Sequence, residues 1–119
     1  MRILLVEDDP LVAAVVAEIL EYAGQIVMFA RAGSAALALF HDGHPRADLL
    51  ILEAALPDMP GWDVLACCRA IIPGLPCVIL TDDPVRDFRV QNYVVTLEKP
   101  FTEDALLAAI RAAVTGSTA

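Results

Sequence analysis

The sequence predicts an α/β fold of the (βα)5 type, with a five-stranded parallel sheet lying between two layers of helices. Five short apolar runs end in an acid or a turn-forming residue, which is typical of strands that are buried on both faces. Segments with apolar residues at helical spacing lie between these runs. Because 119 residues suit one core, we expect a single domain over 1–119, with a tail that frays from about residue 115.

The expected strands are short, and polar or turn-forming residues close each of them. The third strand runs without interruption into Glu53, which is followed by a stretch rich in proline and glycine. Binding sites in open α/β sheets form at the carboxyl ends of the strands, so Glu53 lies where a site is expected. The expected strand limits are 2–6, 25–30, 49–52, 77–80 and 93–97.

Capping residues mark the helices. Asp9 and Pro10 are typical of an N-cap and a first helical position, and Gly24 is typical of a helix stop. Ser34 is expected to cap the second helix, and Thr102 the last. The residues expected to face the core are Val12, Val15, Val16, Ile19 and Leu20 in the first helix, Ala36, Leu37 and Phe40 in the second, Val64, Leu65 and Cys68 in the third, and Leu106, Leu107, Ile110 and Val114 in the last.

The fourth helical segment has the weakest pattern. Val85, Phe88 and Arg89 have the spacing of one short amphipathic helix. Three regular turns do not fit between residues 84 and 93. We therefore expect a fourth helix that is short, tilted or partly irregular.

Composition limits the classes of function. The formal net charge of −8 argues against a duplex-binding protein, which needs a basic face to neutralise phosphates. No apolar run is long enough to cross a bilayer, and acids occur too near the N-terminus for a secretory signal. We expect a cytoplasmic protein without direct contact to nucleic acid or membrane. Its acids form either a solvated surface or, in part, a cation site.

The cysteines and histidines do not have the spacing of a metal site. Cys67 and Cys68 are neighbours and Cys77 stands alone, so we expect buried or half-buried free thiols. His41 and His44 fall in the expected loop after the second helix, where no further ligand accompanies them. Both are interpreted as solvent-exposed side chains.

Notable residues follow four of the expected strands. Glu7 and Asp8 follow the first strand, Glu53 the third, Thr81 the fourth and Lys99 the fifth. Three carboxylates that lie close together need a cation, a proton or an ammonium group. Oxygen ligands suit Mg²⁺, while a lysine and a hydroxyl are donors for an anion, for which a phosphoryl group is the natural candidate.

These motifs together resemble the receiver domain of two-component response regulators, over essentially the whole chain. The resemblance is carried by the stretches 3–9, 56–61, 78–81 and 98–101. It implies a flavodoxin-like three-layer sandwich. It also implies a domain that accepts a phosphoryl group from a histidine kinase onto an aspartate, with Mg²⁺, and then changes shape.

The resemblance assigns roles to individual residues. Glu7 and Asp8 correspond to the acidic pair that binds the metal, and the Ala55 carbonyl corresponds to the backbone ligand. Thr81 corresponds to the hydroxyl that contacts the phosphoryl group. Lys99 corresponds to the family's lysine, whose bond to the following proline is typically cis.

The phosphoacceptor position, which also belongs to the metal-binding set, holds Glu53 instead of aspartate. Glutamate is longer by one methylene, so its carboxylate reaches toward the place where a relative holds its phosphoryl group. Our hypothesis is that Glu53 pairs with Lys99, which leaves the domain unphosphorylated and partly active-like. The alternatives are an acid that fills a vestigial pocket, and transfer onto Glu53 itself.

A second departure concerns the switch region. The connection from Thr81 to Lys99 is about one helical turn shorter than the family usually has. Relatives also carry an aromatic residue three positions before the lysine, and here that switch position is Thr96.

Three functions remain open at this point. The first is a receiver module of a phosphorelay, with a histidine kinase, a phosphotransferase or a downstream signalling protein as partner, and with homodimerisation left open. The second is a phosphorylation-independent pseudo-receiver that acts as a scaffold. The third is a small Mg²⁺-dependent phosphate-handling enzyme. The chain lacks a nucleophilic aspartate and a second base for the third function, so we expect no enzyme and no catalytic residue.

Overall fold

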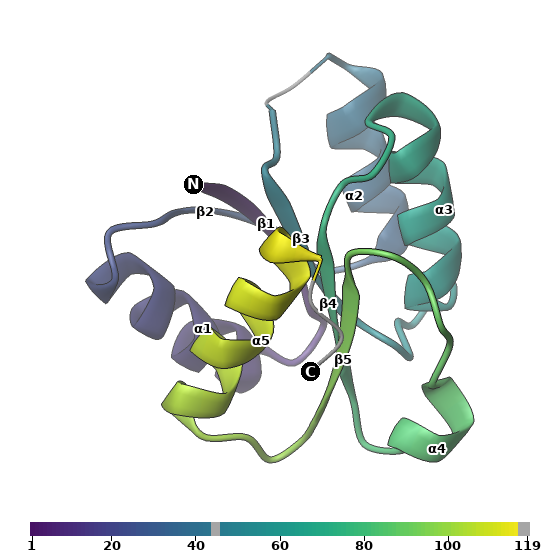
Figure 1. The fold of residues 1–119 in the computed structure, drawn as a ribbon. Helices are drawn as coiled ribbons and strands as arrows, with labels where there is room; N and C mark the ends of the chain where they lie inside the picture. Colours follow the sequence, from purple (N-terminus) through teal and green to yellow (C-terminus); the bar gives the residue numbers. More distant parts are fainter. Residues whose placement is uncertain (44–45, 117–119) are drawn as a thin grey trace.

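Five parallel strands in the order β2-β1-β3-β4-β5 form the centre of the fold. The computed structural model describes residues 1–43 and 46–116, and it confirms the predicted (βα)5 flavodoxin-like architecture (Figure 1). The elements in chain order are β1 (Arg2–Val6), α1 (Pro10–Tyr22), β2 (Ile26–Ala30), α2 (Gly33–His41), β3 (Leu49–Glu53), α3 (Gly61–Ile71), β4 (Cys77–Thr81), α4 (Pro84–Asp87), β5 (Val94–Glu98) and α5 (Glu103–Thr115).

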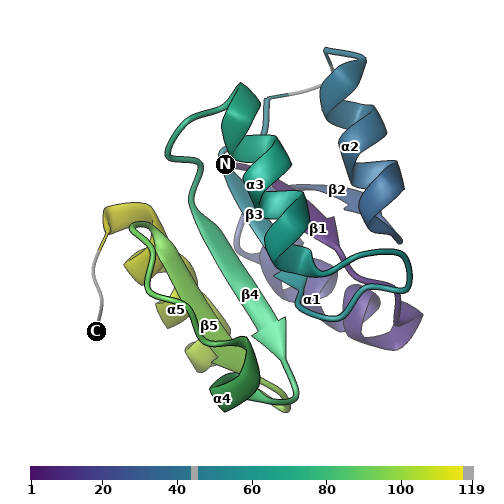
Figure 2. The ribbon, with the colours of Figure 1, turned by 90° about the vertical axis from the view of Figure 1, so that its right-hand side faces the viewer.

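Helices α1 and α5 cover one face of the sheet, and α2 and α3 cover the other (Figures 1 and 2). Side chains that alternate along each strand therefore enter two separate apolar clusters. Ile3 and Leu5 of β1 pack with α1 and α5, whereas Leu4 and Val6 pack on the side of α2 and α3. This two-sided burial explains why the strands are unbroken apolar runs in the sequence.

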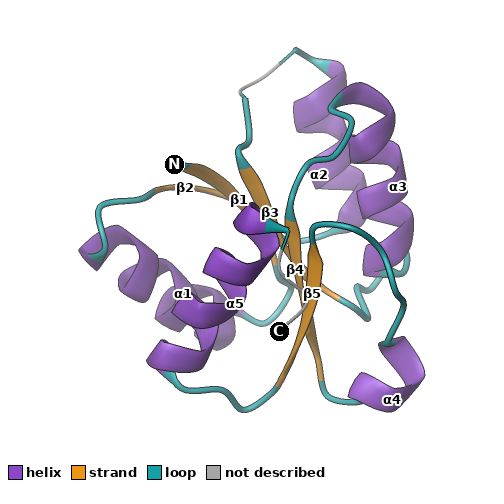
Figure 3. Ribbon diagram, viewed as in Figure 1, coloured by secondary structure: helices purple, strands orange, loops and turns teal. Residues whose placement is uncertain are grey.

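Helix α4 is a single turn at the β5 end of the sheet (Figure 3). The prediction of a shortened fourth helix is confirmed, but the prediction that it packs as an amphipathic helix is wrong. Val85 is 89% exposed and Phe88 is 63% exposed. Polar contacts from α3 hold this segment instead, because the Trp62 indole N–H donates to the Asp87 carbonyl at 2.9 Å and Arg69 donates to the Asn92 carbonyl at 2.8 Å.

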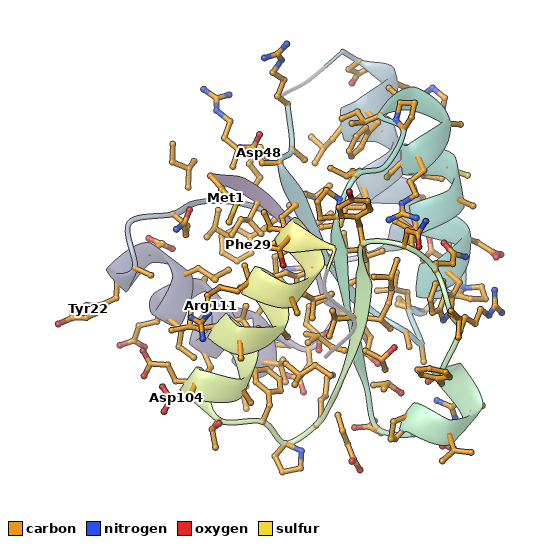
Figure 4. The ribbon with its side chains drawn as sticks, in the orientation of Figure 1. Met1, Tyr22, Phe29, Asp48, Asp104 and Arg111 are labelled. Carbon is orange, nitrogen blue, oxygen red and sulfur yellow. The ribbon has the colours of Figure 1, made fainter. Side chains whose placement is uncertain are left out.

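Two predicted core positions on the helices are wrong. Val15 of α1 is 56% exposed, and the buried residue beside Val16 is Ala17. Val114 of α5 is 39% exposed, and Ala113 is buried instead. In both helices a small alanine faces the sheet. The stripe in contact with the sheet is therefore narrower than the full run of apolar residues. Tyr22 at the end of α1 projects away from the molecule, and it is 92% exposed (Figure 4).

Both ends of α2 differ from the predictions. Ser34 does not cap α2, because the N-cap position is Ala32 and the first amides donate to Asp58 instead. His41 is the exposed last residue of α2 rather than a loop residue, and His44 lies outside the described residues. Helix α5 ends at Thr115, and residues 117–119 of the tail predicted from about residue 115 lie outside the described residues. Thr102 caps α5 as predicted.

The cysteines are free, as predicted, and Cys68 and Cys77 are buried, but the prediction that all three are at least half-buried is wrong because Cys67 is exposed on α3. Across residues 1–43 and 46–116, no helix is both long enough and apolar enough to cross a membrane.

Candidate functional site

The carboxyl ends of the strands bring Glu7, Glu53, Thr81 and Lys99 to one edge of the sheet. Glu53 ends β3 and is in register with Leu80, the residue before Thr81. Parallel strands end at the same edge, so residues that are far apart in the sequence meet there. Glu7, Glu53 and Thr81 are the buried polar residues of the described chain.

Lys99 joins the two glutamates. Its ammonium nitrogen lies 2.5 Å from Glu53 Oε2 and 3.1 Å from Glu7 Oε1. Glu7 is 2% exposed and Glu53 is 5% exposed, so solvent screens this group of charges weakly. One ammonium faces two carboxylates, and Glu7 Oε2 has no hydrogen-bond partner among the described residues. The site is therefore short of positive charge or of a proton.

The pKa values of the site reflect this shortage. Burial raises the pKa of Glu7 to about 7, although the hydrogen bond from Lys99 opposes the change. Burial lowers the pKa of Lys99, but its hydrogen bonds to Glu53 and Glu7 outweigh that effect and leave the pKa above its ordinary value. Lys99 therefore stays charged at neutral pH, whereas Glu7 keeps its proton to a higher pH than an ordinary glutamate does.

The turn after β3 places Glu53. The Gly61 amide donates to the Ala54 carbonyl at 2.8 Å, and Ala55 forms an isolated bridge with Pro60. A Cβ atom at Gly61 would overlap the backbone carbonyl of Glu53, so only glycine closes this turn without displacement. The Ala55 amide donates to Glu53 Oε1 at 3.4 Å. The backbone therefore holds the glutamate side chain over the edge of the sheet.

Thr81 is fully buried, and its hydroxyl is engaged on both sides. It donates to Asp87 Oδ2 at 2.5 Å and accepts from the Asp83 amide at 2.9 Å. Arg86 donates to both Asp87 oxygens, at 3.0 and 2.8 Å. The hydrogen bond from Arg86 holds the pKa of Asp87 below its ordinary value, so this side chain is a carboxylate. Sequence reasoning did not single out Asp87, because the pattern around it is weak.

Other predicted residues lie outside this cluster or at its margin. Asp8 and Ala55 are exposed, and Thr96 is half-buried in the middle of β5, in register with Ile79. The peptide bond from Lys99 to Pro100 is cis, as the resemblance implies.

Asp58 is a second residue that the sequence analysis did not single out. Its carboxylate accepts from the Gly33 amide at 2.9 Å and from the Ser34 amide at 2.8 Å. These bonds lower the pKa of Asp58, with the bond from Ser34 having the larger effect. The loop after β3 is thereby tied to the start of α2. The absence of an Asp or Asn immediately before α2 was a signal that the cap comes from elsewhere.

The sheet order and the placement of acids, threonine and lysine at one edge are those of a signalling domain of two-component systems. The chain belongs to the response regulator receiver domain family, whose model matches residues 3–111. Receiver domains are signalling domains and are generally not enzymes. They interact with histidine kinases or phosphotransferases, and they generally bind Mg²⁺ for phosphorylation.

Similar proteins are transcriptional regulators. The chain is 34% identical over 116 residues to the probable transcriptional regulatory protein TcrX of Mycobacterium tuberculosis, an alignment that covers 94% of this chain and 49% of that protein. It is 33% identical over 115 residues to the transcriptional regulatory protein CusR of Escherichia coli K12, covering 93% of this chain and 50% of CusR. The chain thus spans about half the length of the curated relatives that it matches.

Solved structures agree with this assignment. The N-terminal domain of a response regulator/sensory box/GGDEF protein from Carboxydothermus hydrogenoformans has a TM-score of 0.83 at 28% identity, covering 97% of this chain and 94% of that one. A response regulator receiver domain from Clostridium thermocellum has a TM-score of 0.80 at 25% identity, covering 96% and 94%.

Two of the residues predicted to hold Mg²⁺, Glu7 and Glu53, are paired with Lys99 in this conformation. The described ranges contain no group of three or more Asp, Glu, His or Cys side chains placed to hold a metal. Lys99 already bridges Glu7 and Glu53, and its ammonium takes the place of a cation between them. A hard divalent ion needs several oxygens free to coordinate it. The set of Glu7, Asp8, Glu53 and the Ala55 carbonyl therefore stays a prediction.

Proposed function

We propose that this chain is an atypical receiver module that is not phosphorylated at Glu53 and that signals through protein–protein contact. The observation that carries the proposal is the ion pair between Lys99 Nζ and Glu53 Oε2, at 2.5 Å. A lysine ammonium at this position is the donor that a phosphoryl group would need. In this chain a carboxylate of the protein already binds it.

The chemistry of Glu53 supports the proposal further. Its carboxylate is buried and hydrogen-bonded within the turn that holds it, so little room remains for an incoming phosphoryl group. The pairing also resembles the contact that a phosphorylated receiver would make to its lysine, with one negative group replacing another. We infer that the domain keeps one signalling state. We also propose a cytoplasmic location, for which membership of the receiver family is the only support.

The exposed side of α1 supports a proposal for the partner. Leu11 is 77% exposed and Val15 is 56% exposed, although both are apolar. They belong to a groove of about 430 Å³ that reaches Lys99 and Phe101, next to the site. A histidine kinase or phosphotransferase that seats a helix there would bring its histidine toward the carboxyl edge of the sheet.

A phosphorylation-independent scaffold is the second candidate function. The absence of three metal-holding side chains at one place, within the described chain, favours it. The two candidates differ in what a single substitution does. A receiver blocked only by Glu53 regains phosphoryl uptake in Glu53→Asp, whereas a scaffold with a drifted pocket does not.

Intact-mass spectrometry after incubation with Mg²⁺ and a small acyl-phosphate donor tests this proposal. The unmodified protein and Glu53→Asp are compared side by side. We expect a phosphoryl adduct on the aspartate variant alone. If neither protein gains the adduct, the scaffold is the better description. If the unmodified protein gains it, the proposal that Glu53 is not an acceptor is wrong, or another residue accepts the group.

A further inference from the structure

The hydroxyl of Thr81 has a single proton, and that proton already forms a hydrogen bond within the protein. It points to Asp87 Oδ2 at 2.5 Å, while the Asp83 amide donates to the hydroxyl oxygen at 2.9 Å. A threonine hydroxyl can donate only one hydrogen bond. While it donates to Asp87, it has no proton for a phosphoryl oxygen. Thr81 is fully buried, so water does not compete for the bond.

Asp87 is held in place from two directions. Arg86 donates to both of its carboxylate oxygens, at 3.0 and 2.8 Å. The Trp62 indole N–H donates to its backbone carbonyl at 2.9 Å, and Arg89 lies over the Trp62 ring at 5.1 Å from its centre. The one-turn length of α4 places Asp87 within reach of Thr81. The carboxylate therefore occupies a defined position above the end of β4.

We propose that Asp87 is a positioning residue that withholds the Thr81 hydroxyl from any phosphoryl group at the site. Both donors of the site are then satisfied by carboxylates of the chain: Lys99 by Glu53, and Thr81 by Asp87. The inference rests on the proposed function and adds to it a contact that weakens phosphoryl binding. It follows that Glu53→Asp releases Lys99 and admits a phosphoryl group, which is bound more weakly than it would be if Thr81 did not donate to Asp87.

Beryllofluoride, a tetrahedral phosphoryl analogue that binds carboxylates, tests this inference at equilibrium. Its dissociation constant in the presence of Mg²⁺ is measured for Glu53→Asp with and without Asp87→Ala, using the fluorescence of Trp62, the single tryptophan of the chain. Breaking a hydrogen bond to a charged acceptor is costly, so we expect the double variant to bind about tenfold more tightly.

Two controls separate the hydrogen bond from simple charge removal. Asp82→Ala removes an exposed acid from the same loop and is expected to change the affinity little. Thr81→Val removes the hydroxyl at nearly constant volume, and in that background Asp87→Ala is expected to bring no tighter binding. If Asp87→Ala strengthens binding equally with and without the hydroxyl, the effect is electrostatic and the proposal is overturned.

Loss of beryllofluoride binding in every variant would refute the proposed function without deciding the role of Asp87. In that case the role of Asp87 is tested by a double-mutant cycle of Thr81→Val and Asp87→Ala, made in the protein that keeps Glu53 and measured by urea unfolding. We expect the two changes to couple by about tenfold in the unfolding equilibrium constant. Additive effects would show that Thr81 does not depend on Asp87, which overturns the inference.

Discussion

Glu7→Gln is expected to remove most of the pH dependence of stability between pH 5 and pH 8. Burial raises the pKa of Glu7 from 4.5 to about 7 in the folded protein, which corresponds to roughly 3 kcal/mol. The folded state therefore holds the proton more tightly than the unfolded state. As the pH rises above 4.5 the unfolded chain loses this proton first, so stability falls until the pH passes about 7 and then levels off.

Other shifted groups of the site do not titrate in that window. The pKa of Lys99 is raised above 10.5, so its contribution is lost only at higher pH. The pKa of Asp87 is lowered below 3.8, so its contribution is lost only as the pH falls through that lower value. The pH dependence of stability between pH 5 and pH 8 is therefore assigned to Glu7. Replacing Glu7 with glutamine keeps the shape of the side chain but removes its titratable charge.

Urea unfolding in a chelator-containing buffer at pH 5, 6, 7 and 8 measures the effect. We expect the unmodified protein to lose roughly 3 kcal/mol across this range and Glu7→Gln to lose much less. Asp8→Asn, which neutralises the neighbouring exposed acid, serves as the control and is expected to keep the original slope. A Glu7→Gln profile as steep as that of the unmodified protein would refute the assignment.

Three further substitutions test the contacts around the site. Gly61→Ala is expected to lower the free energy of unfolding, measured by thermal unfolding, by roughly 2 kcal/mol because its Cβ meets a backbone carbonyl. Gly33→Ala, whose Cβ meets a flexible methionine side chain, is the control and is expected to lose less stability; equal losses would contradict the prediction. Asp58→Ala is expected to speed amide exchange at the start of α2, with Asp58→Asn as the control that keeps an acceptor; unchanged exchange would count against the cap. Trp62→Phe is expected to lower the free energy of unfolding by roughly 1 kcal/mol, because the hydrogen bond to the Asp87 carbonyl is lost, and to speed amide exchange in the segment after α4. An unchanged free energy of unfolding would show that this hydrogen bond does not contribute to stability.

The sheet was predictable from sequence because its signals are local. Each strand is an apolar run that ends in an acid or a turn, and the alternation of strands with helices leaves few arrangements. The short α4 was also predictable, since the connection between Thr81 and Lys99 is short. Strand limits differ from the predicted ones by at most one residue at either end. The meeting of Glu53 with Lys99 followed from the same topology, because both lie at carboxyl ends of strands.

The errors concern contacts between segments that the sequence keeps apart. Val15 has the spacing of a core residue, but it is 56% exposed, and Val16 and Leu20 are the α1 residues buried in the cluster that includes α5. Ser34 is a good capping residue by type, yet Asp58 reaches the same amides from another loop. Asp87 contacts Thr81 only because α4 is one turn long. Such contacts depend on three-dimensional placement rather than on periodicity.

The connection between β4 and β5 has a practical consequence for protein engineering. In the described chain, residues 82–93 contribute no side chain to either buried apolar cluster, and Val90 in the middle of this stretch is 86% exposed. A foreign peptide or a reporter domain inserted beside Val90 would leave the packing of the sheet with its four long helices intact. The inserted sequence would then stand a few residues from Asp87, where it could report on events at the carboxyl edge of the sheet.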